Sequence, residues 1–312
     1  MGSADDTSLV RWAWDQQSIW SKAADRLRKN LHWARVTALV LTAAAAVLVT
    51  AAAQATSLSD TPKSVLTWAT FTCASLAALS QALIRPGKVH ERMRTRSVSE
   101  SLKSILYGYL AGVSPYRGAD RDDVFRQKID AVLRDAADLS DRIIGVKAAS
   151  RDLPRVHDVD SYIGARVEGQ MRQYYQPKSV AMLRNARFFR VTETALAVAA
   201  AGLSAAAGVS GKGWVAWLPV ITTISAALAA EAAFQRYSVL AVEYARTSAE
   251  LERLLRDRRA SATHDAAADD AFVTAAERVI SQQNEAWMAR GFAVAESAAP
   301  PQLPSAPQAS PG

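Results

Sequence analysis

Four long apolar stretches dominate the pattern of hydrophobic and polar positions along the chain. They cover residues 36–56, 64–84, 191–210 and 214–234, and only Glu193 and Glu231 interrupt them with a charge. A helix rises about 1.5 Å per residue, so about 20 residues cross the roughly 30 Å hydrocarbon core of a bilayer. Short turns join the first stretch to the second and the third to the fourth. The pattern predicts an all-α membrane protein with two tandem two-pass helical hairpins.

Basic residues gather on one side of these stretches. Those nearest the stretches, on the side away from the hairpin tips, are Arg35, Arg85, Arg190 and Arg236. The only basic residues at the tips are Lys63 and Lys212. Basic residues close to span ends stay in the cytoplasm. We therefore expect both termini and the central segment to form cytoplasmic helical extensions, and the chain to lie in the inner (plasma) membrane of a cell.

Two other structures could produce apolar stretches of this kind. A soluble bundle of alanine-rich helices is one, although it has no need of the one-sided charge. A cleaved signal peptide is the other, because Ala53-Gln54-Ala55 has the form of a cleavage site. The segment before the first stretch contains tryptophan and aspartate, unlike a short basic n-region. The membrane interpretation is therefore favoured.

Polar amphipathic segments surround the hairpins and predict helices there. An internal repeat aligns RKNLHWARVTALVLTAAAA, which begins at Arg28, with LRNARFFRVTETALAVAAA, which begins at Leu183. Both copies enter the membrane from the same side. We divide the chain into a first two-pass domain (1–116), a helical linker (117–158), a second two-pass domain (159–291) and a tail (292–312). The tail is rich in Pro, Ala and Ser and is expected to be disordered.

A stripe of side chains follows the fourth stretch at alternating spacings of four and three. It consists of Leu240, Tyr244, Thr247, Leu251 and Leu254. Such spacing is typical of a short coiled coil between chains. Packing of the stripe within the same chain explains it equally well, so both possibilities remain open.

Composition and motifs limit the kinds of ligand and reaction that the chain is expected to support. The net charge is +7, but the basic residues cluster beside the apolar stretches, where anionic lipid headgroups explain them better than nucleic acid. The single cysteine, Cys73, lies inside the second stretch, so an internal disulfide is impossible. The four histidines form no metal-binding pair, and no nucleophile or phosphate-loop motif occurs. We expect no enzyme activity, no cofactor, no metal and no nucleic-acid partner.

Glu193 and Glu231 are the candidate pore-mouth acids. Ionisable groups in spans tend to face a bundle interior or water. Both glutamates are expected at similar depth near the inner face, close to Arg190 and Arg236. They could form an acidic ring in a cation-passing pore; the alternative is ion pairing with those arginines. Small and hydroxylated residues in the stretches permit close helix contacts, so we expect a homo-oligomer in the lipid bilayer.

The motifs around the hairpins resemble those of SLATT domains, the SMODS- and SLOG-associated two-transmembrane effectors of bacterial conflict systems. In the first half they are Ser99-Glu100-Ser101-Leu102-Lys103, Tyr109 and Pro115-Tyr116. In the second half they are YIGARVEGQMRQYYQPKS from Tyr162, Glu243-Tyr244, and FVTAAERVISQQNEAW, which ends at Trp287. Two departures from the motifs are Pro177, where a helix should continue, and Tyr107-Gly108, where an aromatic-basic pair is usual.

The resemblance implies two SLATT domains in tandem in a bacterial membrane effector. Such effectors act as oligomeric pores or disrupt the membrane in nucleotide-signalled immune systems, including antiphage defence. The resemblance also implies an upstream sensor or a nucleotide-signal-generating partner. The alternative function is a non-conducting membrane anchor that recruits a soluble partner through its cytoplasmic helices.

Overall fold

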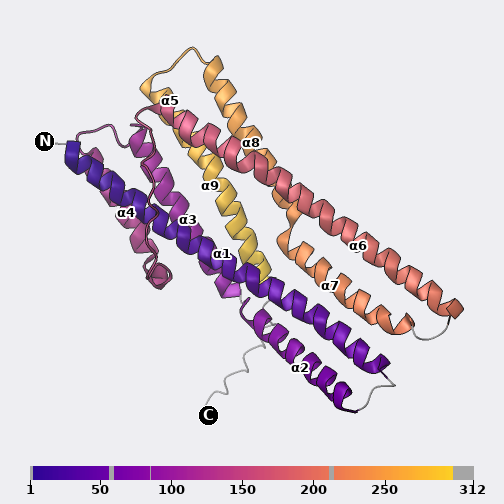
Figure 1. The fold of residues 1–312 in the computed structure, drawn as a ribbon. Coiled ribbons are helices and arrows are strands. Elements are labelled where there is room, and N and C mark those ends of the chain that lie inside the picture. The colour runs from indigo at the N-terminus through magenta and orange to yellow at the C-terminus, as the bar shows by residue number, and fades with distance from the viewer. Residues whose placement is uncertain (1–2, 56–59, 85, 211–213, 298–312) are drawn as a thin grey trace, which may run out of the picture.

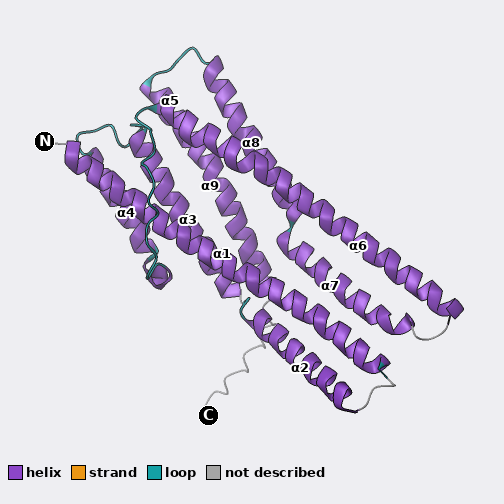
Figure 2. Ribbon diagram, viewed as in Figure 1, coloured by secondary structure: helices purple, strands orange, loops and turns teal. Residues whose placement is uncertain are grey.

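The computed structural model describes residues 3–55, 60–84, 86–210 and 214–297 of the chain (Figure 1). All regular structure in these residues is helical, and Figure 2 shows no strand among them. The predicted all-α class is thereby confirmed.

The first half of the chain is a long helix followed by two shorter helices that pack against it. Helix α1 (Ser3–Gln54) has 52 residues, which corresponds to a rod of about 78 Å. Helix α2 (Asp60–Ala82) packs against the apolar end of α1, and α3 (Pro86–Leu110) packs against its polar end. Gly112, at φ +66°, reverses the chain after α3. Helix α4 (Arg121–Asp135) and the 3₁₀-helix η1 (Ala137–Arg142) complete this half.

The second half repeats the layout. A rod runs through α5 (Val159–Tyr162), the π-helical turns η2 (Ile163–Glu168) and η3 (Met171–Tyr175), and α6 (Gln176–Ser210). The 3₁₀-turn η4 (Trp214–Trp217) leads into α7 (Leu218–Gln235), which packs against α6. Helix α8 (Tyr237–Ala260) returns along α6, and α9 (Ala266–Ser297) packs against α8 and α3. The two halves also touch where α1 contacts α7.

Pro177 made a kink or a break possible at this point, but the rod continues through it. A proline inside a helix clashes with the carbonyl group four residues earlier. The structure passes from η3, whose hydrogen bonds have the wider i→i+5 spacing, directly into α6 at this point. The wider turn makes room for the proline ring, so the helix continues.

Among the residues that the structure describes, four helices are long and apolar enough to cross a membrane. They lie within residues 7–54, 61–82, 159–206 and 215–260, and at most 11% of the most apolar window of each is buried. Large side chains on α2, among them Trp68, Phe71 and Leu79, are more than 60% exposed. A water-soluble bundle would cover such a surface. The apolar ends of these helices lie together at one end of the molecule (Figure 1).

The other end of the molecule is a packed body made of α3, α4, α8, α9, the polar part of α1 and the segment from α5 to η3. Its core side chains include Trp14, Leu102, Tyr109, Phe125, Tyr162 and Leu251. Phe125 and Ile129 of α4 are completely buried. The segment 117–158, expected to be a linker, therefore contributes to the core.

Residues 146–157 form a strap along α1 rather than a free connection. The Ala149 amide donates to Ser18 Oγ at 2.8 Å, and Lys22 Nζ donates to the Lys147 carbonyl at 2.9 Å. Trp14 Nε1 donates to the Asp152 carbonyl at 2.9 Å. These bonds satisfy three backbone groups of the segment and hold the connection between the halves against α1.

The stripe on α8 packs inside this chain. Thr247 and Leu251 are buried, and Tyr244 and Leu254 pack against the core. Of the two possibilities left open by the spacing, the structure has the intrachain one. At the C-terminal end, α9 continues to Ser297, so the first residues of the expected tail are helical. The rest of that tail lies outside the described residues.

Candidate functional site

A buried cluster of charges lies where α3, η2 and α9 meet. Arg166 on η2 is 1% exposed, and its Nε and Nη2 donate to the two carboxylate oxygens of Glu277 on α9, each at 2.9 Å. The Tyr162 hydroxyl donates to Glu277 Oε1 at 2.9 Å. Arg166 Nη1 also lies 3.9 Å from Glu100 Oε2 on α3. We call Glu100, Lys103, Tyr162, Arg166 and Glu277 the body charge cluster.

Helical spacing brings these groups together. Tyr162 and Arg166 are four residues apart and share one face of the rod, and Glu100 and Lys103 are three apart on α3. The Tyr107 ring, also on α3, lies 5.1 Å from the Arg166 guanidinium and 6.2 Å from the Tyr162 ring. The cluster therefore joins the first half of the chain, through α3, to the second half.

The environment of the cluster shifts the pKa values of its members, among them Glu277 and Lys103. Burial raises the pKa of Glu277, but the charge of Arg166 and hydrogen bonds from Arg166, Tyr162 and Ser104 outweigh it, so the net pKa is lowered. Glu277 is therefore ionised at neutral pH. Burial, followed by the positive charge of Arg166, lowers the pKa of Lys103 to about 8.

Replacing Lys103 by methionine is expected to change how stability depends on pH. The Lys103 pKa falls from 10.5 to about 8 on folding, so the unfolded chain holds this proton more tightly. Burying the charged Lys103 therefore lowers the stability of the folded state. This destabilisation is complete below pH 8 and disappears as the pH rises towards 10.5. We expect Lys103→Met to raise Tm relative to the wild type below pH 8, with a smaller gain at pH 10. Thermal unfolding in detergent measures this, and a gain independent of pH would contradict the assignment.

A second group of residues joins the two halves at the ends of the apolar segments. Arg35 on α1 is 8% exposed, and its guanidinium lies 3.5 Å from the centre of the Phe234 ring on α7. The Glu231 carboxylate attracts Arg35, and Gln235 Nε2 donates to Glu231 Oε1 at 2.6 Å. We call Arg35, Glu231, Phe234 and Gln235 the hairpin contact. A cation over an aromatic face is favourable, and more so away from water.

The remaining candidates from the sequence lie apart from this contact. Glu193 is half-buried on α6, Arg190 is exposed on the same helix, and Arg236 is exposed between α7 and α8. Arg85 lies outside the described residues. Of the two candidate pore-mouth acids, Glu231 takes part in the hairpin contact, and the acidic ring formed by several copies stays a prediction.

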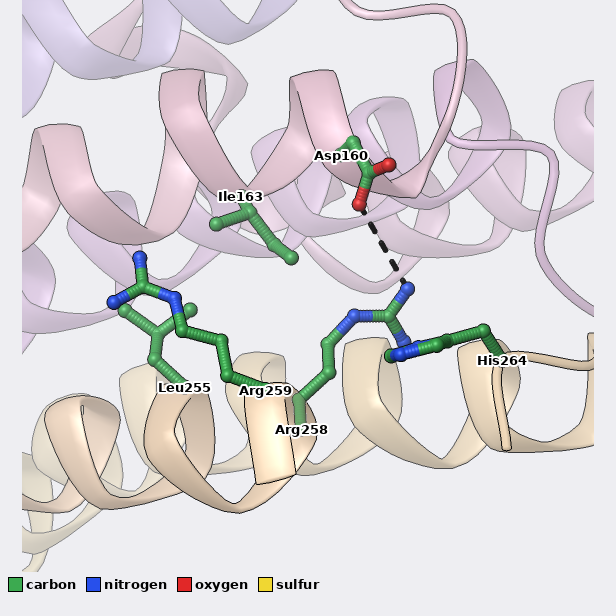
Figure 3. A pocket seen from close by; sticks show the side chains of 6 residues that line it. All are labelled: Asp160, Ile163, Leu255, Arg258, Arg259 and His264. Carbon is green, nitrogen blue, oxygen red and sulfur yellow. Dashed lines mark ion pairs between the residues drawn. The ribbon is translucent and has the colours of Figure 1, made fainter. Parts of the chain in front are cut away.

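A cavity of about 370 Å³ opens between α5 and the end of α8, lined by Asp160, Ile163, Leu255, Arg258, Arg259 and His264 (Figure 3). Figure 3 shows Arg258 directed at Asp160, at 3.9 Å. Arg258 also pairs with Asp269 at 2.7 Å, and Arg259 with Glu168 at 3.1 Å. The acids neutralise both arginines, so we assign no ligand to this cavity.

Sequence reasoning missed the body charge cluster. Tyr162, Arg166 and Glu277 lie within the motifs quoted above, but Arg166 and Glu277 are 111 positions apart. Spacing within one helix gives no signal for such a pair. The sequence offers one indication, because Arg166 follows Tyr162 by four residues and so shares a helix face with it.

Comparison with known proteins follows the same division into halves. The family model for SMODS and SLOG-associating 2TM effector domain 1 matches residues 162–287. The model for a protein of unknown function (DUF4231) matches residues 16–123. No curated protein and no solved structure is significantly similar to the chain. Arg166 and Glu277 lie in the first of these matches, and Glu100 and Lys103 lie in the second. Residues 162–287 therefore belong to the SLATT family of two-transmembrane effector domains, and the match of the first half to a second family model is consistent with two domains in tandem.

Proposed function

We propose that the chain is a bacterial membrane effector that assembles into an oligomeric pore, or otherwise breaches the bilayer, in a nucleotide-signalled conflict system. The observation that carries the proposal is the uncovered apolar surface of the candidate spans, which continues directly from a packed polar body. Lipid or further copies of the chain must cover that surface. Membership of the SLATT effector family supports the conflict-system role.

Pore formation requires more than one copy in this proposal. Four helices are too few to surround a wide aqueous channel, so several chains share its wall. The two hairpins lie in the membrane with their tips outside, and the packed body lies in the cytoplasm with both termini. There it receives the trigger from an upstream sensor or a nucleotide-signal-generating partner. The hairpin contact holds the resting arrangement of the spans.

Release of a trapped dye or ion from liposomes tests this function. Purified full-length protein, reconstituted with its triggering partner, is expected to release the contents, whereas protein without the trigger is not. If no trigger and no protein density permeabilises the vesicles, the pore proposal fails.

The candidate pore-mouth acids provide a sharper test. If Glu193 and Glu231 from several copies form a ring, Glu193→Gln with Glu231→Gln removes two negative charges per chain from the mouth. We expect cation-over-anion selectivity to fall several-fold while the conducting state still forms. Reversal potentials in planar bilayers measure this, with Glu252→Gln on α8 as the matched control. Unchanged selectivity in a working channel would contradict the acidic ring.

A non-conducting anchor is the second candidate function. The size and tight packing of the body favour it, because a body of this kind can recruit a soluble partner without any pore. Co-sedimentation of a partner with vesicles that never leak would decide for the anchor.

A further inference from the structure

The candidate spans form a row that has a different helix at each end. Figure 1 shows them in the order α2, α1, α7, α6, and packing joins α2 to α1, α1 to α7 and α7 to α6. Each hairpin contributes its second helix and then its first helix to this row. The order within the first hairpin is therefore repeated in the second, with α2 at one end of the row and α6 at the other.

The joint between the two hairpins uses one face of α1, and this face is covered. It contains Arg35 of the hairpin contact, which is 8% exposed. Residues at spacings of four and three share a helix face, and all members of this one are buried or half-buried. The members are Arg35, Leu39, Thr42 and Ala46.

The corresponding face of α6 is uncovered. The internal repeat aligns the four α1 residues with four residues of α6, and each of the four on α6 is exposed in the described chain. They are Arg190, Thr194, Ala197 and Ala201. We call these residues, with Ser204 one turn further on, the α6 edge. On α1 the equivalent face packs against a second helix of a hairpin, so a second helix of a hairpin is the neighbour that the α6 edge fits.

The α6 edge allows another helix to come close. Ala197 and Ala201 are four residues apart, and small residues at this spacing let helix backbones approach each other in a membrane. The hydroxyls of Thr194 and Ser204 donate to the carbonyl groups of Arg190 and Ala200, at 3.0 and 2.9 Å. Because these hydroxyls already have partners within α6, the edge does not need a polar partner on the neighbouring helix.

The opposite end of the row presents large apolar side chains. Helix α2 packs against α1 on the side of Ala77, which is 5% exposed. Val65, Trp68 and Leu79 share a face away from that side, and they are 62%, 68% and 63% exposed. We call these three residues, with the exposed Thr72, the α2 edge. By the repeat, α2 corresponds to α7, the helix that covers α1.

The two edges match in depth and in size. Ala201 lies nine residues before the end of α6 at Ser210, and Trp68 lies eight residues after the start of α2 at Asp60. Each is therefore about 12–14 Å from the hairpin tip, so a large side chain comes level with a small one. A two-fold contact between like edges would instead set Trp68 against Trp68, or Arg190 against Arg190, where like charges repel.

We propose that the α6 edge of one chain packs against the α2 edge of a second copy of the same chain, so that the row of spans continues from copy to copy. All copies cross the bilayer in the same direction, so a rotation about the bilayer normal relates neighbours. A contact between unlike faces that repeats in this way closes into a ring. The interface rests on the proposed function, because it supposes that the chain assembles in a membrane.

Cysteine cross-linking of full-length protein in liposomes tests which edges meet. In a Cys73→Ala background, Ala197→Cys on α6 and Thr72→Cys on α2 lie at the same depth. A mixture of the two variants, carrying tags of different size, is expected to give a linked pair, and each variant alone at least about ten-fold less. A chain with both substitutions should give a ladder of linked copies. Equal yields from either variant alone would indicate a two-fold contact and would overturn the proposal.

Bulky substitutions test the close approach. Ala197→Leu with Ala201→Leu enlarges the α6 edge at two exposed positions, so the chain should keep its Tm in detergent while the oligomeric fraction in nanodiscs falls about ten-fold or more. Ala195→Leu with Ala199→Leu is the matched control, because both positions are exposed on another side of α6 at the same spacing. Native mass spectrometry measures the oligomers. An equal loss in both pairs, or in neither, would show that the α6 edge is not the interface.

The outcomes separate the interface from the proposed function. Protein that releases liposome contents without forming the mixed cross-link would refute the interface and leave the pore. Protein that forms the mixed cross-link but never permeabilises vesicles would refute the pore and support the interface. Protein that does neither would refute both.

Discussion

Replacing Glu277 by glutamine is expected to destabilise the packed body by about 3–5 kcal/mol, the typical cost of breaking a buried ion pair. Glu277 accepts both hydrogen bonds from Arg166, which is 1% exposed. Without the carboxylate, the guanidinium keeps its charge in a site that water cannot reach. Thermal unfolding in detergent should show a fall in Tm of roughly 10 °C or more.

Two companion variants identify the cause of that loss. Arg166→Met with Glu277→Leu removes both charges at similar volume, so it should recover most of the stability. Glu250→Gln breaks an exposed pair with Arg253, in which Arg253 Nη2 lies 2.7 Å from Glu250 Oε1, and should leave Tm almost unchanged because solvent screens the pair. A Glu277→Gln protein as stable as the wild type would show that Arg166 is neutralised by other groups, with Glu100 the nearest.

Arg35→Ala is expected to release liposome contents without a trigger, about ten-fold faster than the wild type. The variant removes the cation from the face of Phe234 and from the neighbourhood of Glu231, the contact that ties α1 to α7. A desolvated cation–π contact contributes about 2 kcal/mol. Its loss is enough to shift the equilibrium between the resting and the open arrangement at least about ten-fold. This expectation rests on the proposed pore.

A distance measurement makes the Arg35 result independent of conduction. Spin labels on α1 and α7 should report a wider or more heterogeneous separation in Arg35→Ala than in the wild type. Arg184→Ala, at an exposed arginine on α6, should change neither the leak nor the distances. If Arg35→Ala leaves both unchanged, the hairpin contact does not hold the resting state.

The sequence predicted the helices well and their partners poorly. The apolar stretches and the repeat indicate four candidate spans, each beside a polar helix. Segment length and charge asymmetry can be read from a short piece of sequence without knowledge of the fold. The stripe on α8 shows the limit of so short a piece, because its spacing suits a coiled coil between chains as well as the intrachain packing that the structure has. Similarly, composition placed the start of the proline-rich tail at residue 292, but α9 continues into it as far as Ser297.

The candidate site divides in the same way. Glu231 and Arg35 are recognisable from the sequence, since each is a charge at the edge of an apolar stretch. Their association through Phe234 was not predictable, because it depends on how one hairpin lies against the other. The strap at residues 146–157 was also missed, since its hydrogen bonds run to side chains and backbone of α1 more than 120 positions away.

By itself, the sequence determined that this is an all-helical chain with four candidate membrane spans, because the length and apolar character that a bilayer requires are properties of each segment alone. Only the tertiary structure decided which charged side chains are buried and which residues they pair with. Arg166 reaches Glu277 and Glu100 only after α3, η2 and α9 have packed, and Arg35 reaches Phe234 only after the two hairpins meet. The physical reason is that the cost of burying a charge depends on the final arrangement of partners around it, which no single helix contains.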